Sequence, residues 1–269
     1  MATDEEEILS SGGVTQVVRV GTTVRRPVRP FTATVQAYLR HVRERGFDAA
    51  PEPLGVDDQG REVLSFVPGD VPDNPLPDYS TTDDVLVDLA RLVRRLHDAA
   101  EGWVPPPDAV FGAIPGTPDP PLEPLFDVPD LVAHQDYCPG NVVFRDGRPV
   151  ALIDFDLARP TTRVADLVNL LHWWAPLQNP VDRAPALADI DVVPRVRAAV
   201  EAYGLTTAQR AQVAPVALRR SRNSVHAMRA AAEVDPVFRH WWQTGTAEKV
   251  VRSRHWLAAE APRLAAALA

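Results

Sequence analysis

Three side chains with oxygen ligands, set at close spacing, are the residues of this 269-residue sequence best suited to chemistry. Asp136 follows His134 by two positions, Asn141 follows Asp136 by five, and Asp154 lies in the run Ile-Asp-Phe-Asp at residues 153–156. Carboxylate and amide oxygens are the ligands that Mg²⁺ prefers, and a further carboxylate beside such a site can accept a proton. The set therefore suits phosphoryl transfer, in which a protein mainly positions reactants and neutralises charge.

A β-hairpin is predicted between Asn141 and Asp154. Residues 142–144 and 150–153 are β-prone runs, and the Asp-Gly pair at 146–147 tolerates the positive φ of a tight turn. In a hairpin centred there, the numbers of paired residues sum to about 293. Asn141 and Asp154 should then lie side by side at the open end, with Asp136 on the loop just before the first strand.

The ordered set over residues 134–166 resembles the catalytic loop of the aminoglycoside phosphotransferase/choline kinase group, which are small-molecule kinases with a protein-kinase-like fold. An isolated His-x-Asp predicts nothing, and an Asp at a strand end is usually a turn residue or a helix cap. The order of the residues and their strand–turn–strand context carry the resemblance. Gln135 departs from it, because the group usually has Gly or a small residue at this position.

The resemblance implies a role for each residue of the loop. Asp136 would be the base that accepts the proton of the acceptor hydroxyl, and His134 would brace the loop. Asn141 and Asp154 would hold Mg²⁺ against the phosphates of ATP or GTP, and Asp156 would contact a second metal ion or shape the loop.

Asp166 matches the aspartate that ties down the catalytic loop in this group, and an N-cap of the following helix is an equally good interpretation.

An α+β, two-lobed protein-kinase-like fold is expected from the same resemblance. Residues 1–67 would form a small nucleotide-binding lobe with an antiparallel sheet and one helix, residues 68–80 the hinge, and residues 81–269 a larger, mainly helical lobe. The sequence patterns agree with this division. Three strands are predicted over residues 8–26, a helix over 31–45, a hairpin over 56–67, and helices from Thr82 onward, with breaks near Pro180, Gly204, Asp235-Pro236 and Gly245.

Nucleotide contacts are expected from two segments of the small lobe. Gly12 and Gly13 lie in a turn of small residues whose backbone N–H groups can approach phosphates, although such a turn is more often an ordinary hairpin connection. Ser65, Phe66 and Val67 occupy the position where backbone groups of the resembling kinases meet the base.

The phosphate-binding lysine of kinase-like enzymes has no counterpart in the first lobe, because the only lysine of the chain is Lys249. Arginine also binds phosphate well, and alternation along a strand lets only one of two neighbouring arginines face the nucleotide. We expect Arg25 to take this role rather than Arg26, since Val24-Arg25 best matches the hydrophobic-Lys pattern. The predicted helix offers only Glu44, at its far end, so the usual lysine–glutamate pair is in doubt.

Composition narrows the class of protein. The net charge is −8, and 45% of the residues are hydrophobic. No apolar run approaches the roughly 20 residues of a membrane helix, no basic stripe with aromatic residues suggests nucleic acid, and the acidic N-terminus is unlike a secretory leader. A single cysteine, Cys138, fits a reducing cytoplasm. The oligomeric state is left open.

The sequence thus predicts a Mg²⁺-dependent small-molecule kinase that uses ATP or GTP. Two alternatives remain: a catalytically weak nucleotide-binding pseudokinase, and a metal-dependent hydrolase with His134, Asp136 and Asp154 as ligands. Residues 161–269 carry 14 basic and 9 acidic residues and five tryptophans, which predicts a neutral or anionic, partly apolar acceptor rather than a polycationic aminoglycoside. The tryptophan pairs at 173–174 and 241–242 either line this pocket or pack in the core.

Overall fold

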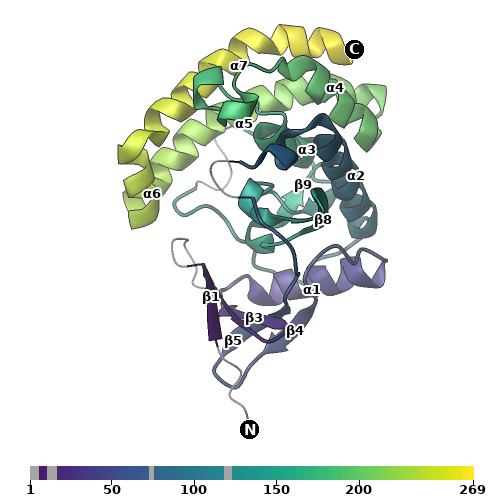
Figure 1. The fold of residues 1–269 in the computed structure, drawn as a ribbon, viewed down its shortest axis with the longest axis vertical. Coiled ribbons are helices and arrows are strands. Elements are labelled where there is room, and N and C mark those ends of the chain that lie inside the picture. The colour runs from purple at the N-terminus through teal and green to yellow at the C-terminus, as the bar shows by residue number, and fades with distance from the viewer. Residues whose placement is uncertain (1–5, 11–16, 73–75, 118–122) are drawn as a thin grey trace.

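The computed structural model describes residues 6–10, 17–72, 76–117 and 123–269. The chain forms two lobes, a strand-rich one that holds the N-terminus and a larger helical one (Figure 1). Gly12 and Gly13 lie outside the described residues, so their expected contact with phosphate stays a prediction.

The smaller lobe is built on a five-stranded antiparallel sheet with the strand order β1-β2-β3-β5-β4. Helix α1 (Thr32–Glu44) contacts β4 and also the helix Asp83–Ala100 (α2) of the larger lobe. The predicted strands, helix and hairpin of residues 8–67 are therefore confirmed. The strands are β1 (Glu6–Ser10), β2 (Val17–Val20), β3 (Thr23–Pro27), β4 (Pro53–Val56) and β5 (Arg61–Ser65).

The larger lobe is mainly helical. The long helices α5 and α7 pack against each other and form an arc along one side of the lobe, with α6 at one end of the pair (Figure 1). Breaks occur at Pro180, Gly204, Asp235 and Gly245, as predicted. The helices are α2 (Asp83–Ala100), α3 (Arg163–Trp174), α4 (Val192–Tyr203), α5 (Thr207–Val234), α6 (Pro236–Trp241) and α7 (Ala247–Leu268).

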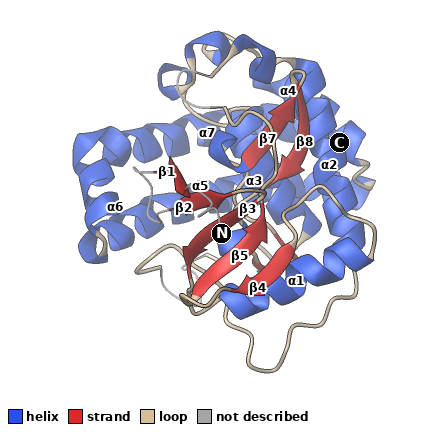
Figure 2. Ribbon diagram, turned by 60° about the horizontal axis from the view of Figure 1, so that its bottom comes forward, coloured by secondary structure: helices blue, strands red, loops and turns tan. Residues whose placement is uncertain are grey.

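The predicted hairpin is present as β7 (Val142–Arg145) and β8 (Arg148–Leu152), and it lies beside α2 (Figure 2). Val142 pairs with Leu152 and Arg145 with Arg148, with a shift of register between Val143 and Phe144. The open end of the hairpin therefore presents the chain just before Val142 and just after Leu152.

Two further strands, β6 (Leu131–Ala133) and β9 (Arg159–Thr161), were not predicted. Each has only three residues, and β9 contains a proline, so neither shows the alternation that marks a strand. Their antiparallel pairing places the loop that follows β6 beside the segment that follows β8.

The connection between the lobes is fastened to the hairpin at one point. Asp70 and Phe144 exchange two backbone hydrogen bonds of 2.9 and 2.7 Å. The preceding Gly69 has φ +147°, and a Cβ there would lie 2.4 Å from the carbonyl oxygen of Phe144. Glycine is therefore required by its backbone conformation and by the close approach of the two chains.

We expect Gly69→Ala to lower the free energy of unfolding by at least about 2 kcal/mol more than Gly60→Ala does, because a new methyl group would overlap backbone atoms. Gly60 also has positive φ, but a Cβ there meets nothing within 4 Å, so it reports the conformational cost alone. Denaturant unfolding of the two variants measures the difference. Equal losses of stability would show that the contact with Phe144 is not tight.

Candidate active site

The open end of the hairpin brings together the residues that the sequence singled out. The Asn141 side-chain amide donates hydrogen bonds to the backbone oxygen of Asp136 at 3.1 Å and to its carboxylate Oδ2 at 3.0 Å. The N–H of Ile153 donates to the backbone oxygen of Asn141 at 2.9 Å, which places Asp154 next along the chain. The amide nitrogen of Asn141 is thus occupied by Asp136, and its Oδ1 remains as a possible metal ligand.

His134 is fully buried beneath this site. Its Nε2 lies 2.9 Å from the backbone oxygen of Ile153, and its Nδ1 lies 3.2 Å from the backbone nitrogen of Asp136. A ring that donates at Nε2 and accepts at Nδ1 is the neutral tautomer protonated on Nε2. The ring also lies 4.3 Å from that of Phe155, between ring centres. Both nitrogens are therefore occupied by backbone groups, an arrangement that supports bracing and leaves His134 no atom for a metal ion.

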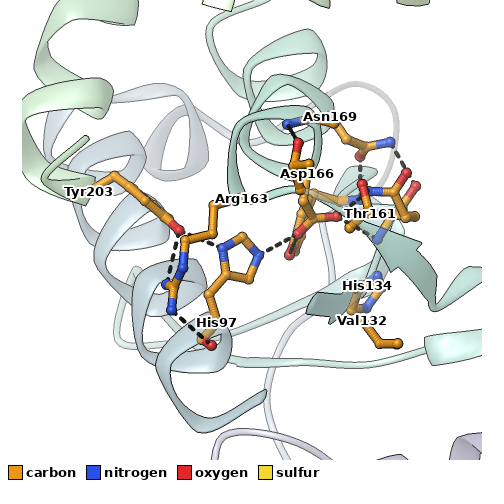
Figure 3. A network of polar contacts seen from close by, with 12 residues as sticks. His97, Val132, His134, Thr161, Arg163, Asp166, Asn169 and Tyr203 are labelled. Atoms are coloured by element: carbon orange, nitrogen blue, oxygen red, sulfur yellow. Dashed lines mark hydrogen bonds and ion pairs between the residues drawn. The ribbon is translucent and has the colours of Figure 1, made fainter. Parts of the chain in front are cut away.

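The buried carboxylate of Asp166 is the centre of a network that holds this loop (Figure 3). Its Oδ1 accepts hydrogen bonds from the backbone N–H of Gln135 at 2.8 Å and from the Gln135 side chain at 2.6 Å. Its Oδ2 accepts one from the Tyr137 hydroxyl and lies 2.7 Å from Nε2 of His97. Burial opposes ionisation of Asp166, but the hydrogen bonds from its neighbours outweigh that effect, and its pKa lies below the ordinary value.

The N-cap of α3 is Thr162, whose side chain accepts a hydrogen bond from the N–H of Ala165. Of the two interpretations of Asp166, the one that ties it to the preceding loop is therefore correct.

Gln135 has φ +65°, a left-handed conformation that explains why small residues are usual at this position. Its side-chain hydrogen bond to Asp166 helps to offset the strain. Asn169 clamps the same turn, because it accepts from the N–H of Tyr137 at 3.0 Å and donates to the carbonyl of Gln135 at 2.7 Å. Trp174 donates from its indole to the carbonyl of Tyr137 at 2.7 Å. The sequence analysis missed these roles of Tyr137, Asn169 and Trp174.

Arg26, and not Arg25, faces the aspartates of the hairpin. The Nη1 of Arg26 lies 3.2 Å from Oδ1 of Asp154, its Nη2 lies 2.7 Å from Oδ1 of Asp156, and its Nε lies 2.6 Å from Oε2 of Glu62. Burial works against the charge of Arg26, but the three carboxylates hold its pKa above the ordinary value.

Arg25 instead lies on the opposite face of β3, with its Nε 3.3 Å from Oδ2 of Asp57. The expectation that Arg25 points toward the nucleotide site is therefore wrong. The reason is that Arg26 pairs across the sheet with Glu62, which is fully buried on β5 and supplies the counter-charge for an inward arginine. Glu62, in the predicted hairpin, was the available signal. The sequence analysis looked for this glutamate only in the helix.

The two aspartates that contact Arg26 differ in their surroundings. The side chain of Asp154 is 50% exposed, and its φ of +60° turns the chain sharply after β8. Asp156 is largely enclosed, and burial, followed by the negative charge of Asp154, raises its pKa to about 7. Burial also raises the pKa of Asp136. The site thus concentrates carboxylates in a confined space, with Arg26 as their cation.

The residues expected to meet the nucleotide base lie at the end of β5 and just beyond it. Ser65 accepts a hydrogen bond from the N–H of Glu52 at 2.7 Å, and the N–H of Phe66 donates to the carbonyl of Thr22 at 2.9 Å. Val67 packs against the core. The Ser65 hydroxyl and the Phe66 N–H are therefore used within the lobe, and a contact of this segment with a base stays a prediction.

The donor set fits Mg²⁺ bound together with phosphates. Asn141, Asp154 and Asp156 offer one amide oxygen and two carboxylates, whereas Mg²⁺ takes its remaining ligands from water and substrate phosphates. In the described ranges, no group of three or more His, Cys, Asp or Glu side chains is arranged to hold a metal ion.

The described part of the chain also has no helix long and apolar enough to cross a membrane.

Comparison with known proteins connects this geometry to a family. Residues 110–203 match the model of the phosphotransferase enzyme family. The trifolitoxin immunity protein of Rhizobium leguminosarum bv. trifolii is 31% identical over 211 residues, which cover 77% of each chain.

Solved structures share the two-lobed fold. A choline/ethanolamine kinase family protein from Mesorhizobium loti superposes with a TM-score of 0.65 at 18% identity, over 99% of this chain and 92% of the other. The amicoumacin kinase hAmiN, in complex with AMP-PNP, Ca²⁺ and its antibiotic, gives a TM-score of 0.65 at 12% identity, over 96% and 88%. The chain therefore belongs to the phosphotransferase enzyme family of aminoglycoside phosphotransferase- and choline kinase-like proteins, and has their protein-kinase-like fold.

Proposed function

We propose that this protein transfers the terminal phosphoryl group of a Mg²⁺-bound nucleoside triphosphate to a hydroxyl group of a small molecule. The observation that carries the proposal is the meeting of Asp136, Asn141 and Asp154 at one end of the hairpin. A carboxylate that accepts a proton then lies beside oxygens suited to a divalent cation. The family membership of the chain supports the same reaction class.

In this mechanism the ionised carboxylate of Asp136 accepts the proton of the acceptor hydroxyl as its oxygen attacks the phosphorus atom. Asn141 fixes that carboxylate through the hydrogen bond of 3.0 Å, and His134 and Asp166 hold the loop from below. Asn141 and Asp154 would hold the cation, which when bound neutralises charge on the phosphate oxygens. Asp156 would either coordinate a second metal ion or shape the loop.

Arg26 would take the place of the usual phosphate-binding lysine. Its guanidinium is paired with Asp154 and Asp156. With Asp154 engaged by a cation, Arg26 would have one carboxylate partner fewer, and its N–H groups would be available to phosphate oxygens. Glu62 would keep the arginine in place during that exchange, because their 2.6 Å contact does not involve the metal site.

The Arg26–Asp154 pair also favours one alternative, a nucleotide-binding protein with little or no turnover. If the ion pair between Arg26 and Asp154 were permanent, Asp154 would not be available to coordinate the cation. Turnover of ATP and GTP with and without Mg²⁺ separates the two functions. The panel of acceptors should include toxin-like hydroxyl compounds, because the curated relative is named for immunity to trifolitoxin.

We expect Asp136→Asn to keep nucleotide binding but to lower turnover by about 10²-fold or more, since the base is lost while its shape remains. Asp154→Asn should instead weaken Mg²⁺-dependent nucleotide binding. Asp146→Asn is the matched control, because Asp146 lies at the tight turn at the other end of the same hairpin. Nucleotide consumption and calorimetric binding measure these effects. Parent-like behaviour of both site variants would contradict the assignment.

Arg26 is tested with variants that do not leave Glu62 buried without a partner. Arg26→Lys should fold and keep nucleotide affinity within about tenfold, because a cation still faces the phosphates. The double variant Arg26→Met/Glu62→Gln removes both charges together and should bind nucleotide at least about tenfold more weakly. Arg25→Ala is the control, and a loss of affinity there as large as in the double variant would contradict the orientation of β3.

A further inference from the structure

Helix α1 lies between the sheet of the smaller lobe and the larger lobe (Figure 1). Two of its polar residues, four positions apart and therefore on one face of the helix, fasten it to the larger lobe. Thr34 accepts a hydrogen bond from the N–H of Val110 at 2.9 Å, and the Tyr38 hydroxyl donates to the carbonyl of Val132 on β6 at 3.1 Å. These contacts hold α1 without using the carboxylates around Arg26.

Gln36 is the polar residue of α1 that faces the sheet. On a helix of 3.6 residues per turn it lies roughly 200° from Tyr38. Gln36 is 5% exposed, and its Nε2 donates hydrogen bonds to the carbonyl of Gly55 at 3.0 Å and to Oε1 of Glu62 on β5 at 3.3 Å. Its Oε1 accepts a hydrogen bond from Nη2 of Arg40 at 3.0 Å. Both polar atoms of this buried amide therefore have partners.

The partners of Gln36 fix the orientation of its amide. A flipped amide would place Oε1 against the carbonyl of Gly55 and the carboxylate of Glu62, and would place its N–H groups against the guanidinium of Arg40. A charged glutamate at position 36 would also repel the Glu62 carboxylate. Because the carboxylate of this pair lies on β5, the helix has to offer a neutral donor.

Glu62 is fully buried and uses one oxygen for each of its two neighbours. Its Oε1 accepts from Gln36, and its Oε2 accepts from Nε of Arg26 at 2.6 Å. The two Nη groups of Arg26 then face Asp154 and Asp156, at 3.2 and 2.7 Å. Because a guanidinium is rigid and planar, a partner that fixes its Nε edge also fixes the direction of both Nη groups. Gln36 therefore acts on Arg26 through Glu62.

We propose that Gln36 is a positioning residue for Arg26, the proposed phosphate-binding cation, and that it couples the position of α1 to Arg26 through Glu62. This inference rests on the proposed function, in which Arg26 contacts the nucleotide. The single helix glutamate of kinase-like enzymes is replaced here by a carboxylate on β5 and a neutral amide on α1. Since α1 is fastened to the larger lobe, this arrangement aligns an arginine of the smaller lobe with the aspartates of the hairpin.

Binding of AMP-PNP with Mg²⁺ tests the role of Gln36. Gln36→Met keeps an unbranched side chain but removes the donor to Glu62, so we expect the affinity to fall by about fivefold or more. Thr34→Val is the matched control, because it removes one buried hydrogen bond from the other face of α1 and should bind like the parent. Thermal unfolding shows whether each variant is folded. Parent-like affinity of Gln36→Met, or an equal loss in Thr34→Val, would overturn the proposal.

A second variant moves the charge and should produce a gain of affinity, which a misfolded protein would not show. Glu62→Gln alone removes the carboxylate beside Arg26 and should weaken nucleotide binding by about tenfold. In Gln36→Glu/Glu62→Gln, the amide at position 62 can accept from Arg26 and donate to the new carboxylate at position 36. We expect this double variant to bind at least about threefold more tightly than Glu62→Gln. Absence of this recovery would contradict the coupling through position 62.

Unfolding measurements separate this inference from the proposed function. A double-mutant cycle between Gln36→Met and Arg26→Met/Glu62→Gln measures the coupling of Gln36 to the ion pair and needs no nucleotide. A coupling near zero overturns the inference. If the parent does not bind AMP-PNP at all, the proposed function fails, and a clear coupling still shows that Gln36 positions Arg26.

Discussion

The active-site loop depends on one buried carboxylate. Asp166 accepts hydrogen bonds from the backbone of Gln135 and from Tyr137 and is paired with His97, a residue of α2. One side chain thus joins α2, α3 and the loop after β6, and it does so without contact with solvent. The left-handed turn at Gln135 persists because this network overdetermines it. The position of Asp136, next along the chain, follows from that turn.

A second constraint is electrostatic. Several carboxylates lie close together at the site, and the cation that balances them is an arginine rather than a lysine. Glu62, Asp154 and Asp156 all lie against Arg26, whose guanidinium can contact three partners at once. A lysine ammonium is a compact point charge and does not offer this planar fork. The arginine also stays charged when buried, which a lysine does less readily. An arginine in place of the usual lysine therefore changes the geometry of the cluster and retains the positive charge that phosphate binding needs.

Much of the fold could be predicted from the sequence, because its signals are local. The hairpin at residues 142–152 follows from two β-prone runs around Asp-Gly, and α2 follows from apolar residues at helical spacing, with Leu89 and Val93 fully buried. The inward face of β3 could not be predicted from local pattern, because Arg25 and Arg26 are adjacent and chemically identical. Their difference arises from Glu62 on another strand and from Asp154 at a sequence distance of 128 residues.

Non-local contacts also explain the other omissions. Asn169 and Trp174 hold the active-site loop across more than 30 residues of sequence, and nothing in their own segment of α3 distinguishes them from core residues.

The distribution of charge around Asp136 has a chemical consequence. Phosphoryl transfer would bring a negatively charged nucleotide to a site that already holds the carboxylates of Asp136, Asp154 and Asp156, and this repulsion must be offset by cations. Arg26 is the cation paired with two of these carboxylates, Asp154 and Asp156. Asp136 must remain ionised to accept a proton, although burial raises its pKa, and the N–H groups of Cys138 and Asn141 that donate to its carboxylate favour the ionised form. The hydrogen bonds that fix the position of this carboxylate would therefore also keep it ready to accept the proton.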